Sequence, residues 1–277
     1  MKGKTVVITG GTSGIGEVAA LRLAEMGARI VVVARDPQRG EAVMARLRQA
    51  NPSVIHGLHF ADLFSLAAVK RVAAEIAAAE PKIDVLINNA GALFETRETT
   101  VDGLERTFAL NHMAYFVLTN GLLANLKPGA RIVSTASDAH KMARLHFDDL
   151  QSERNFKGFR VYGTSKLCNI LFTRELARRL EGTGITAVCL HPGFVATRFA
   201  DNNDGLLGKA FAVLKRIVAI SPEAGAKTII HLASAPGVDG QGGTYWVKCK
   251  PASPTRAGRS DADAKRLWDI SERIARG

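Results

Sequence analysis

Short apolar runs, many of them rich in β-branched residues, alternate along this chain with longer segments in which apolar residues recur every three or four positions. The short runs predict buried strands and the longer segments predict amphipathic helices. Strands are expected at residues 5–9, 29–34, 54–60, 83–87, 130–135, 185–190 and 243–247. Because strands and helices alternate at βαβ spacing, we expect an α/β fold in which one doubly wound parallel sheet is flanked by helices, in a single domain.

The helical periodicity is clearest at residues 66–79, 102–126, 162–180 and 261–275. Two further helix starts carry capping signals, with Pro37 in a first turn and Ser221-Pro222-Glu223 as a cap followed by an N1 proline. Residues 138–158 fit no regular pattern and are expected to form a charged insert. Residues 195–220 are amphipathic and broken by turns, so they form either a lid over an apolar substrate pocket or an ordinary packed helix pair.

Composition limits the classes of protein to consider. The chain has 277 residues, of which 47% are hydrophobic and 23% charged, as is usual for a globular protein. The net charge of +11 is scattered along helices beside acidic residues and shows no nucleic-acid recognition module, so nucleic acid is not an expected partner. No apolar run approaches the ~20 residues of a membrane span, and we expect a cytoplasmic protein. The cysteines, Cys168, Cys189 and Cys249, are widely spaced and predict reduced thiols without a disulfide framework or a metal site.

A glycine-rich segment follows the first predicted strand and opens the first helix. Glycines allow a backbone to approach a pyrophosphate, and a helix N-terminus offers N–H groups to it, so the context predicts a dinucleotide site, with a plain tight turn as the alternative. The candidate residues of this loop are Gly10, Thr12, Ser13, Gly14, Ile15 and Gly16.

The end of the second strand bears on the choice of cofactor. An arginine at this position of a dinucleotide fold accommodates a 2′-phosphate, whereas an acid binds a free 2′-hydroxyl. Ala34 and Arg35 precede Asp36 here, which favours NADP and leaves NAD as the weaker alternative.

Other polar residues follow later strands. Asp62 is expected to cap the next helix or to bond an adenine edge, and both roles can hold together. The amides and small residues of Asn88-Asn89-Ala90-Gly91 would let the backbone pass close to a cofactor and tie neighbouring strands together. Asn111 lies in the middle of a predicted helix, where asparagine is unfavourable and invites a functional explanation. Ser137 ends a strand at the edge where ligands bind in parallel sheets.

Tyr162 and Lys166 lie four residues apart in a helical pattern, so both side chains can point into one space. An ammonium group favours a neighbouring phenolate, and the pair is therefore predicted to lower the pKa of Tyr162 for proton transfer; two solvated side chains are the alternative. His140, His146 and Asp148 in the insert are read as surface polar residues rather than as a metal site.

Taken together, these signals resemble the short-chain dehydrogenase/reductase family over essentially the whole chain. The motifs, in order, are Thr9-Gly10-x-x-x-Gly14-Ile15-Gly16, Asn88-Asn89-Ala90-Gly91, Asn111, Ser137, Tyr162-x-x-x-Lys166 and Pro192-Gly193. The stretches 136–140 and 166–176, the spacing of 25 residues from Ser137 to Tyr162, and Arg266-Leu267-Trp268 resemble the retinol dehydrogenase-like branch. The hydrophobic N-terminal anchor typical of that branch is not seen, so membrane association and retinoid specificity are not inferred.

The resemblance implies a Rossmann-type fold and a role for each matching residue. Tyr162 would be the general acid or base, Lys166 would lower the pKa of Tyr162 and hold the nicotinamide ribose, Ser137 would bond the substrate oxygen, and Asn111 would hold a water of a proton relay. The cofactor residues implied beyond the glycine loop and Arg35 are Asp62, Leu63, Asn89, Ala90, Gly91, Tyr162, Lys166, Pro192, Gly193, Val195 and Thr197.

The function expected on this basis is NADP(H)-dependent interconversion of a hydrophobic small-molecule aldehyde or ketone with its alcohol. The alternatives are an NAD-dependent alcohol dehydrogenase of the same fold and a non-catalytic nucleotide-binding regulator. By resemblance to the family, a homodimer or homotetramer built partly on the helix of Tyr162 is expected. No metal is expected.

Overall fold

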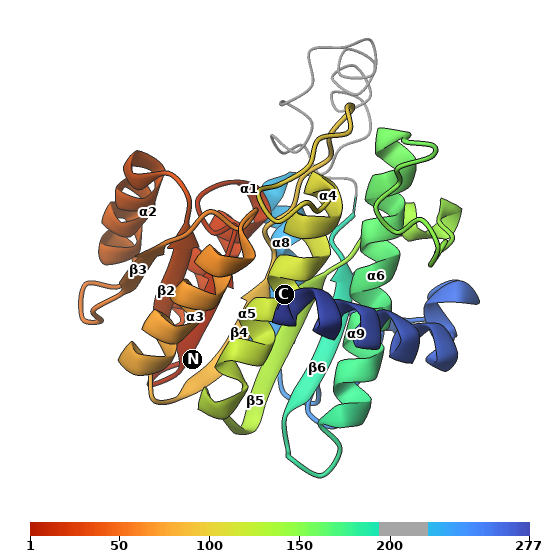
Figure 1. The fold of residues 1–277 in the computed structure, drawn as a ribbon. Helices are drawn as coiled ribbons and strands as arrows, with labels where there is room; N and C mark the ends of the chain where they lie inside the picture. The colour runs from red at the N-terminus through yellow and green to blue at the C-terminus, as the bar shows by residue number, and fades with distance from the viewer. Residues whose placement is uncertain (194–220) are drawn as a thin grey trace.

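The computed structural model describes residues 1–193 and 221–277, and an eight-stranded sheet runs through the centre of this part of the chain (Figure 1). The strand order is β3-β2-β1-β4-β5-β6-β7-β8, and every neighbouring pair is parallel except β7 and β8. The strands are β1 (Thr5–Thr9), β2 (Arg29–Ala34), β3 (Gly57–Phe60), β4 (Ile83–Asn88), β5 (Leu126–Thr135), β6 (Thr186–His191), β7 (Tyr245–Val247) and β8 (Lys250–Ala252). The predicted doubly wound, Rossmann-type α/β class is confirmed.

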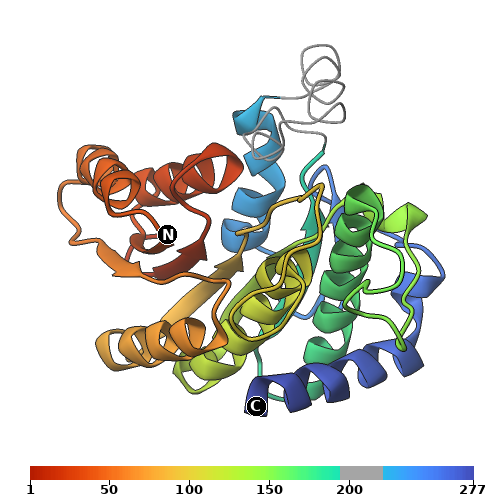
Figure 2. The same ribbon diagram turned by 45° about the horizontal axis from the view of Figure 1, so that its top comes forward.

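Helices cover both faces of the sheet. They are α1 (Gly14–Glu25), α2 (Pro37–Ala50), α3 (Leu66–Ala79), α4 (Arg106–Phe108), α5 (Ala114–Leu122), α6 (Gly158–Arg179), α8 (Pro222–Ser234) and α9 (Asp261–Arg276). The strands alternate between two buried apolar clusters, as a period of two requires: Val7 belongs to one cluster, and Val6 and Ile8 belong to the other. Helices α3, α5, α6 and α9 lie on one face of the sheet, and α1, α2 and α8 lie on the other (Figure 2). Strands buried on both faces explain the continuous apolar runs in the sequence.

The order of the strands reverses at β1, which pairs with β2 on one side and β4 on the other. In open α/β sheets a crevice forms beyond the carboxyl ends of the strands at such a reversal, and ligands bind there. The fold therefore brings the ends of β1, β4 and β5 together as the place to look for chemistry.

Several predicted element boundaries are wrong: α6 begins at Gly158 rather than at residue 162, and β7 begins at Tyr245 rather than at residue 243. The third strand begins at Gly57 rather than at residue 54, and β5 begins at Leu126 rather than at residue 130. The helix expected from residue 102 begins at Arg106, because the preceding chain folds back in a bridge between Thr99 and Glu105 and Glu105 then caps the helix. A pattern of apolar residues does not record these tertiary pairings.

The capping predictions are confirmed at two sites and wrong at a third. Asp36 accepts from the Arg39 N–H at the start of α2, with Pro37 in its first turn, and Ser221 accepts from Ala224 at the start of α8. Asp62 does not cap α3: its carboxylate accepts from the nearby Phe64 N–H, and Ser65 is the cap. Asp62 lies one turn too early because the chain makes a short bend before the helix begins.

Cys168 and Cys189 are buried free thiols and Cys249 is a half-buried one, as predicted. Among the helices of the described residues, none is both long and apolar enough to cross a membrane. The predicted lid at 195–220 lies outside the described residues.

Candidate active site

The loop between β1 and α1 is shaped by close contacts that only glycine permits. Gly10 has a positive φ of 67°, and a Cβ there would lie 2.8 Å from the Cα of Ala90; a Cβ on Gly16 would lie 2.2 Å from the Gly10 carbonyl oxygen. Gly14 has a φ of 56°. The loop therefore packs directly against the end of β4, and its glycines serve a specific backbone path.

The N-terminus of α1 has no side-chain cap. In the described part of the chain, side chains cap α2, α3, α4, α8 and α9, whereas α1, with Ser13 as its N-cap residue, makes no such bond, and neither do α5 and α6. Helix N-terminal N–H groups that no side chain caps are suited to bind an anionic phosphate. The path of the loop and the uncapped helix end are compatible with a bound anion, and the role of Thr12, Ser13 and Ile15 at a dinucleotide pyrophosphate stays a prediction.

Asn89 joins three strands at this edge. Its Nδ2 donates to the Thr9 and Gly10 carbonyl oxygens at 3.3 Å, and its Oδ1 accepts from Thr135 Oγ1 at 3.2 Å. The Asn89 and Ala90 N–H groups both donate to Thr9 Oγ1. This polar link between β1, β4 and β5 confirms that the amides following β4 tie neighbouring strands together.

A cleft of about 350 Å³ lies beside the glycine loop, between it and the helices α1 and α2. Its lining includes Thr12 and Ser13 from the loop, Glu17 from α1, and Arg39 and Arg46 from α2, and Arg46 forms an ion pair with Glu17. The sequence reasoning missed Arg39 and Arg46, although their spacing on the helix that begins at Pro37 could have indicated them. Arg35 lies at the exposed end of β2, and its guanidinium is 5.9 Å from the centroid of the Phe64 ring.

Asn111 interrupts the helix that carries it, as its position predicted. It lies in a π-helical turn, Ala109–Met113, between α4 and α5 and is fully buried. Its side chain accepts from the Ala92 N–H at 2.9 Å and donates to the Ala92 carbonyl oxygen at 3.0 Å and to Ser165 Oγ at 2.9 Å. Single π-turns inside helices are frequent at functional sites.

Lys166 extends from α6 to the edge of the sheet and is 2% exposed. Its Nζ donates to the Thr135 carbonyl oxygen at 3.1 Å, and no carboxylate among the described residues pairs with it. A Cβ added to Gly91 would lie 3.2 Å from Lys166 Nζ and 3.1 Å from Asn111 Oδ1. Gly91 therefore leaves room for both groups, which brings three predicted site residues together.

Tyr162 lies one turn before Lys166 on α6 and bonds with Ser137, whose backbone follows β5. The ammonium of Lys166 is 5.5 Å from the centroid of the Tyr162 ring. The structure thus places the Ser137, Tyr162, Lys166 and Asn111 side chains around one edge of the sheet, where β4 and β5 end and the strand order reverses near β1.

Burial is the main influence on the pKa values of Tyr162 and Lys166. It raises the pKa of Tyr162 above its ordinary value, although the bond with Ser137 opposes that rise, and it lowers the pKa of Lys166 to about 7. For the protein groups alone, the pKa of Tyr162 thus moves in the direction opposite to the predicted one, because burial disfavours the phenolate and Lys166 does not contribute to the shift.

Three further predicted cofactor residues lie after the ends of β3 and β6. Leu63 is buried near the end of β3, and Pro192 and Gly193 are half-buried just after β6. Val195 and Thr197 lie outside the described residues.

The insert at 138–158 departs from its prediction at one residue. It starts as a 3₁₀ turn, Asp138–Met142, and His140 within that turn is fully buried rather than on the surface. His146 and Asp148 lie in the irregular part that follows, and Asp148 pairs with Arg154.

Comparisons with known proteins agree with this geometry. A family model described as short chain dehydrogenase matches residues 4–205. The chain is 41% identical to retinol dehydrogenase 14 of Mus musculus, over 98% of this chain and 86% of that protein. It is 37% identical to retinol dehydrogenase 12 of Homo sapiens, over 98% and 86% of the respective chains.

Two solved structures show the same fold. A crystal structure of an uncharacterized protein from Mycobacterium paratuberculosis has a TM-score of 0.80 at 31% identity and covers 99% of this chain and 94% of its own. A short chain dehydrogenase from Burkholderia cenocepacia J2315, in complex with NADP, has a TM-score of 0.70 at 28% identity, with coverages of 88% and 95%.

The fold and the site define a nicotinamide-dependent oxidoreductase. The chain belongs to the short-chain dehydrogenase/reductase family, and it resembles the retinol dehydrogenases within it. Its reaction class is accordingly the interconversion of alcohols and carbonyl compounds.

Proposed function

We propose that this protein uses NADP(H) to interconvert a hydrophobic aldehyde or ketone with its alcohol, with Tyr162 as the general acid and base. The observation that carries the proposal is the contact between Tyr162 and Ser137, with Lys166 on the same face of α6. Two hydroxyl groups that bond with each other can both reach one carbonyl oxygen, and this is the geometry required to polarise and protonate it.

Each residue then has a distinct task. Ser137 donates a hydrogen bond to the substrate oxygen, and Tyr162 gives that oxygen its proton in reduction or removes it in oxidation. Lys166 binds the nicotinamide ribose and favours the phenolate form of Tyr162 when it is charged. Bound NADP(H) would supply or accept the hydride.

Protons would reach Tyr162 through the space that Lys166 shares with Asn111. Asn111 is held by Ala92 and Ser165, and its Oδ1 lies beside Gly91, as does Lys166 Nζ. We propose that Asn111 orients a water in this space for the relay. Asn169 Oδ1 is buried there without a hydrogen-bond partner among the described residues, although its Nδ2 donates to the same Thr135 carbonyl oxygen that Lys166 binds, and such a group favours an ordered water.

Three features support NADP over NAD. Arg35 is exposed at the end of β2, where a 2′-phosphate would lie, and Arg39 lines the adjoining cleft. The carboxylate of Asp36, which could otherwise bind a 2′-hydroxyl, accepts the Arg39 N–H as a helix cap. NADP is the molecule bound in the Burkholderia cenocepacia relative.

The test is consumption of NADPH and, in parallel, of NADH, with aldehydes and ketones graded from short aliphatic to long polyene chains. We expect turnover with NADPH and a preference for long apolar substrates. Tyr162→Phe should lower kcat by about 10²- to 10⁴-fold while NADPH affinity changes little, because only the proton-transfer group is lost. Full activity of Tyr162→Phe would refute the assigned role.

Cofactor choice is tested by Arg35→Ala. Loss of a charge-assisted contact of about 1.5–3 kcal/mol predicts roughly ten- to a hundredfold weaker NADPH binding with little change for NADH. Arg48→Ala, on the exposed side of α2, is the matched control. Equal losses for both cofactors would assign Arg35 another role.

An NAD-dependent enzyme and a non-catalytic nucleotide-binding regulator are the competing functions. Relative kcat/KM for the two cofactors separates the first, and tight NADPH binding without turnover on the whole panel would favour the second. We further expect a cytoplasmic homodimer or homotetramer. Because α9 of the same chain packs on the C-terminal half of α6, an interface would use other surfaces than that half.

A further inference from the structure

His140 is fully buried beside Ser137, and both of its ring nitrogens have partners. The Thr255 N–H lies 3.3 Å from Nε2, and the Ser137 carbonyl oxygen lies 2.7 Å from Nδ1. An amide N–H can only donate, so Nε2 must be the acceptor, and Nδ1 then carries the hydrogen that it donates to Ser137. The surroundings thus fix one neutral tautomer of His140, and burial, which lowers its pKa, agrees with that state.

Asp138, which follows Ser137, is held from three sides. Its N–H donates to His191 Nδ1 at 3.2 Å, and its carboxylate accepts from the Tyr245 hydroxyl at 3.0 Å and from Lys141 at 2.8 Å. The ring of Tyr245 also meets His140 edge-on, with centroids 5.2 Å apart. We call Asp138, His140, His191 and Tyr245 the serine clamp.

The clamp lies where the sheet no longer fixes the chain. The last ladder bond at this end of β5 runs from the Ala136 N–H to the Leu190 carbonyl oxygen at 2.7 Å. Ser137 comes next, and its own hydroxyl is shared between the Ala139 N–H, at 3.2 Å, and Tyr162. The Ser137 carbonyl oxygen accepts the His140 backbone N–H, at 3.1 Å, within the 3₁₀ turn, and the His140 ring adds a second bond to the same oxygen.

We propose that the serine clamp positions Ser137 for the reaction, with His140 holding its carbonyl oxygen. His140 is a positioning residue, since it acts through Ser137 and does not reach the reacting atoms. Thr255, in the segment after β8, fixes the tautomer of His140, and so connects the C-terminal part of the chain to the active site. This inference rests on the role proposed above for Ser137.

A pair of amide variants separates the two nitrogens of His140. The Asn amide N–H₂ can take the place of Nδ1–H and keep the bond to Ser137, whereas the Gln carbonyl can take the place of Nε2 and keep only the bond from Thr255. We expect His140→Asn to keep kcat within about threefold and His140→Gln to lower it more than about tenfold, the equivalent of 1.4 kcal/mol, with similar losses of Tm and unchanged NADPH affinity.

A double-mutant cycle with Ser137→Ala tests whether His140 acts through Ser137. In that background His140→Gln should lower kcat by less than about twofold further, because the group to be positioned has been removed. Equal kcat losses in the Asn and Gln variants, or additive losses in the cycle, would overturn the proposal.

If His140→Gln does not fold, Tyr245→Phe tests the proposal in its place. It removes only the hydroxyl bonded to Asp138, and the proposal predicts a kcat loss of about three- to tenfold that vanishes in the Ser137→Ala background. An unchanged kcat would overturn it. Tyr162→Phe is measured in the same series. Full turnover of that variant would refute the proposed function. If Tyr162→Phe is inactive, the proposed function stands, and the other variants test the serine clamp alone.

Discussion

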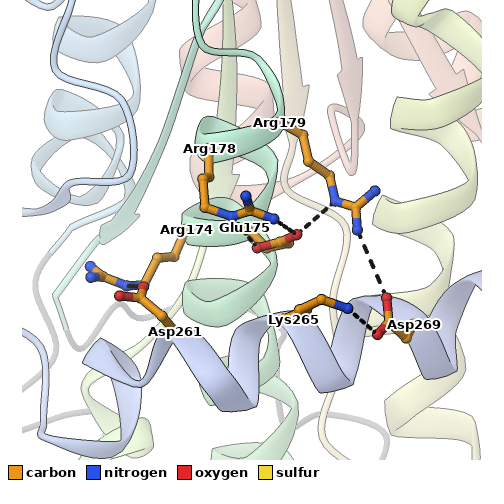
Figure 3. A network of polar contacts seen from close by, with 7 residues as sticks. All are labelled: Arg174, Glu175, Arg178, Arg179, Asp261, Lys265 and Asp269. Carbon is orange, nitrogen blue, oxygen red and sulfur yellow. Dashed lines mark hydrogen bonds and ion pairs between the residues drawn. The ribbon is translucent and has the colours of Figure 1, made fainter.

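The two halves of α6 each bury a charged side chain, and they do so in opposite ways. In the N-terminal half, Lys166 lies against the end of the sheet and is bonded to a carbonyl oxygen. In the C-terminal half, the side chain of Glu175 is just as buried, at 2% exposure, but Arg178 and Arg179 both bind it (Figure 3). Within the described residues, one helix therefore carries a buried cation without an ionic partner and a buried anion with two.

The difference appears in the pKa values. Burial lowers the pKa of Lys166 to about 7. Burial alone would raise the pKa of Glu175, but the hydrogen bonds from its two arginines outweigh that effect and hold the pKa below its ordinary value. A charge near its titration point is useful for chemistry, whereas a charge held firmly by partners serves structure. The two halves of α6 should thus respond differently to substitution.

The C-terminal half of α6 also packs against α9. Trp268 stacks on Phe172 with an interplanar angle of 11°, meets Phe116 edge-on at 4.9 Å, and lies 4.3 Å from the Arg179 guanidinium. On α9, Lys265 pairs with Asp269, and Asp269 in turn lies 3.8 Å from Arg179 (Figure 3).

The largest effect on stability is expected from Trp268→Ala. Removing this buried ring should lower the free energy of unfolding by about 3–5 kcal/mol, with kcat of the folded protein unchanged. Denaturant unfolding and steady-state kinetics measure the two effects. Arg273→Ala on the exposed side of α9 is the control and should change neither. A loss of kcat without a loss of stability would show that the two halves of α6 are not separate.

The converse result is expected for Lys166→Met. The substitution should lower kcat by about 10²- to 10⁴-fold, since Lys166 assists the proton-transfer group. It should leave the free energy of unfolding within about 1 kcal/mol or raise it, because a desolvated charge gives way to an apolar side chain of similar length. In this variant the Thr135 carbonyl oxygen would still accept a hydrogen bond from Asn169 Nδ2. Marked destabilisation would mean that Lys166 also holds the fold.

Glu175→Gln should act on stability alone and less strongly than Trp268→Ala. The variant keeps the shape of the side chain but loses the charge that Arg178 and Arg179 bind, so the free energy of unfolding should fall by about 2 kcal/mol. Activity per folded molecule should be unchanged. If kcat fell together with stability, charge at this end of the helix would be coupled to the site.

The sequence predicted that Tyr162 and Lys166 point the same way from α6 but not how the C-terminal half of this helix is covered, and the reason is physical. Tyr162 and Lys166 are one helical turn apart, so their common direction follows from local geometry. The same holds for Gly10 and Gly14, whose positive φ values belong to a local turn between strand and helix.

Other features depend on contacts between distant residues. Glu175 and Arg178 lie three residues apart, so their pairing follows from helix geometry, whereas the packing of α9 against this half of α6 does not. His140 was read as a surface residue because its partner, Thr255, lies 115 residues away. The β8 strand is too short for a periodic signal, and the lowered pKa of Lys166 is a consequence of burial, which spacing does not reveal.

The dependence of stability on pH gives the smallest and most discriminating comparison, at most about 1.4 kcal/mol per pH unit for one proton. In the unfolded chain Lys166 titrates near ~10.4, so from about pH 7 to pH 10 the unfolded state binds more protons than the folded state, and stability rises with pH through this group. The stability advantage of Lys166→Met over the wild type should therefore shrink between pH 7 and pH 10.

Glu175 should respond in another window. Its folded pKa is lowered, so its contribution is fully present above its unfolded pKa of ~4.3 and is lost as the pH falls through the folded value. The stability difference between wild type and Glu175→Gln should thus be constant from pH 6 to pH 9 and shrink only in acid. Unfolding of both variants and the wild type across this range measures the two windows, and a Lys166→Met difference that does not change between pH 7 and pH 10 would contradict a lysine that is half-charged near neutrality.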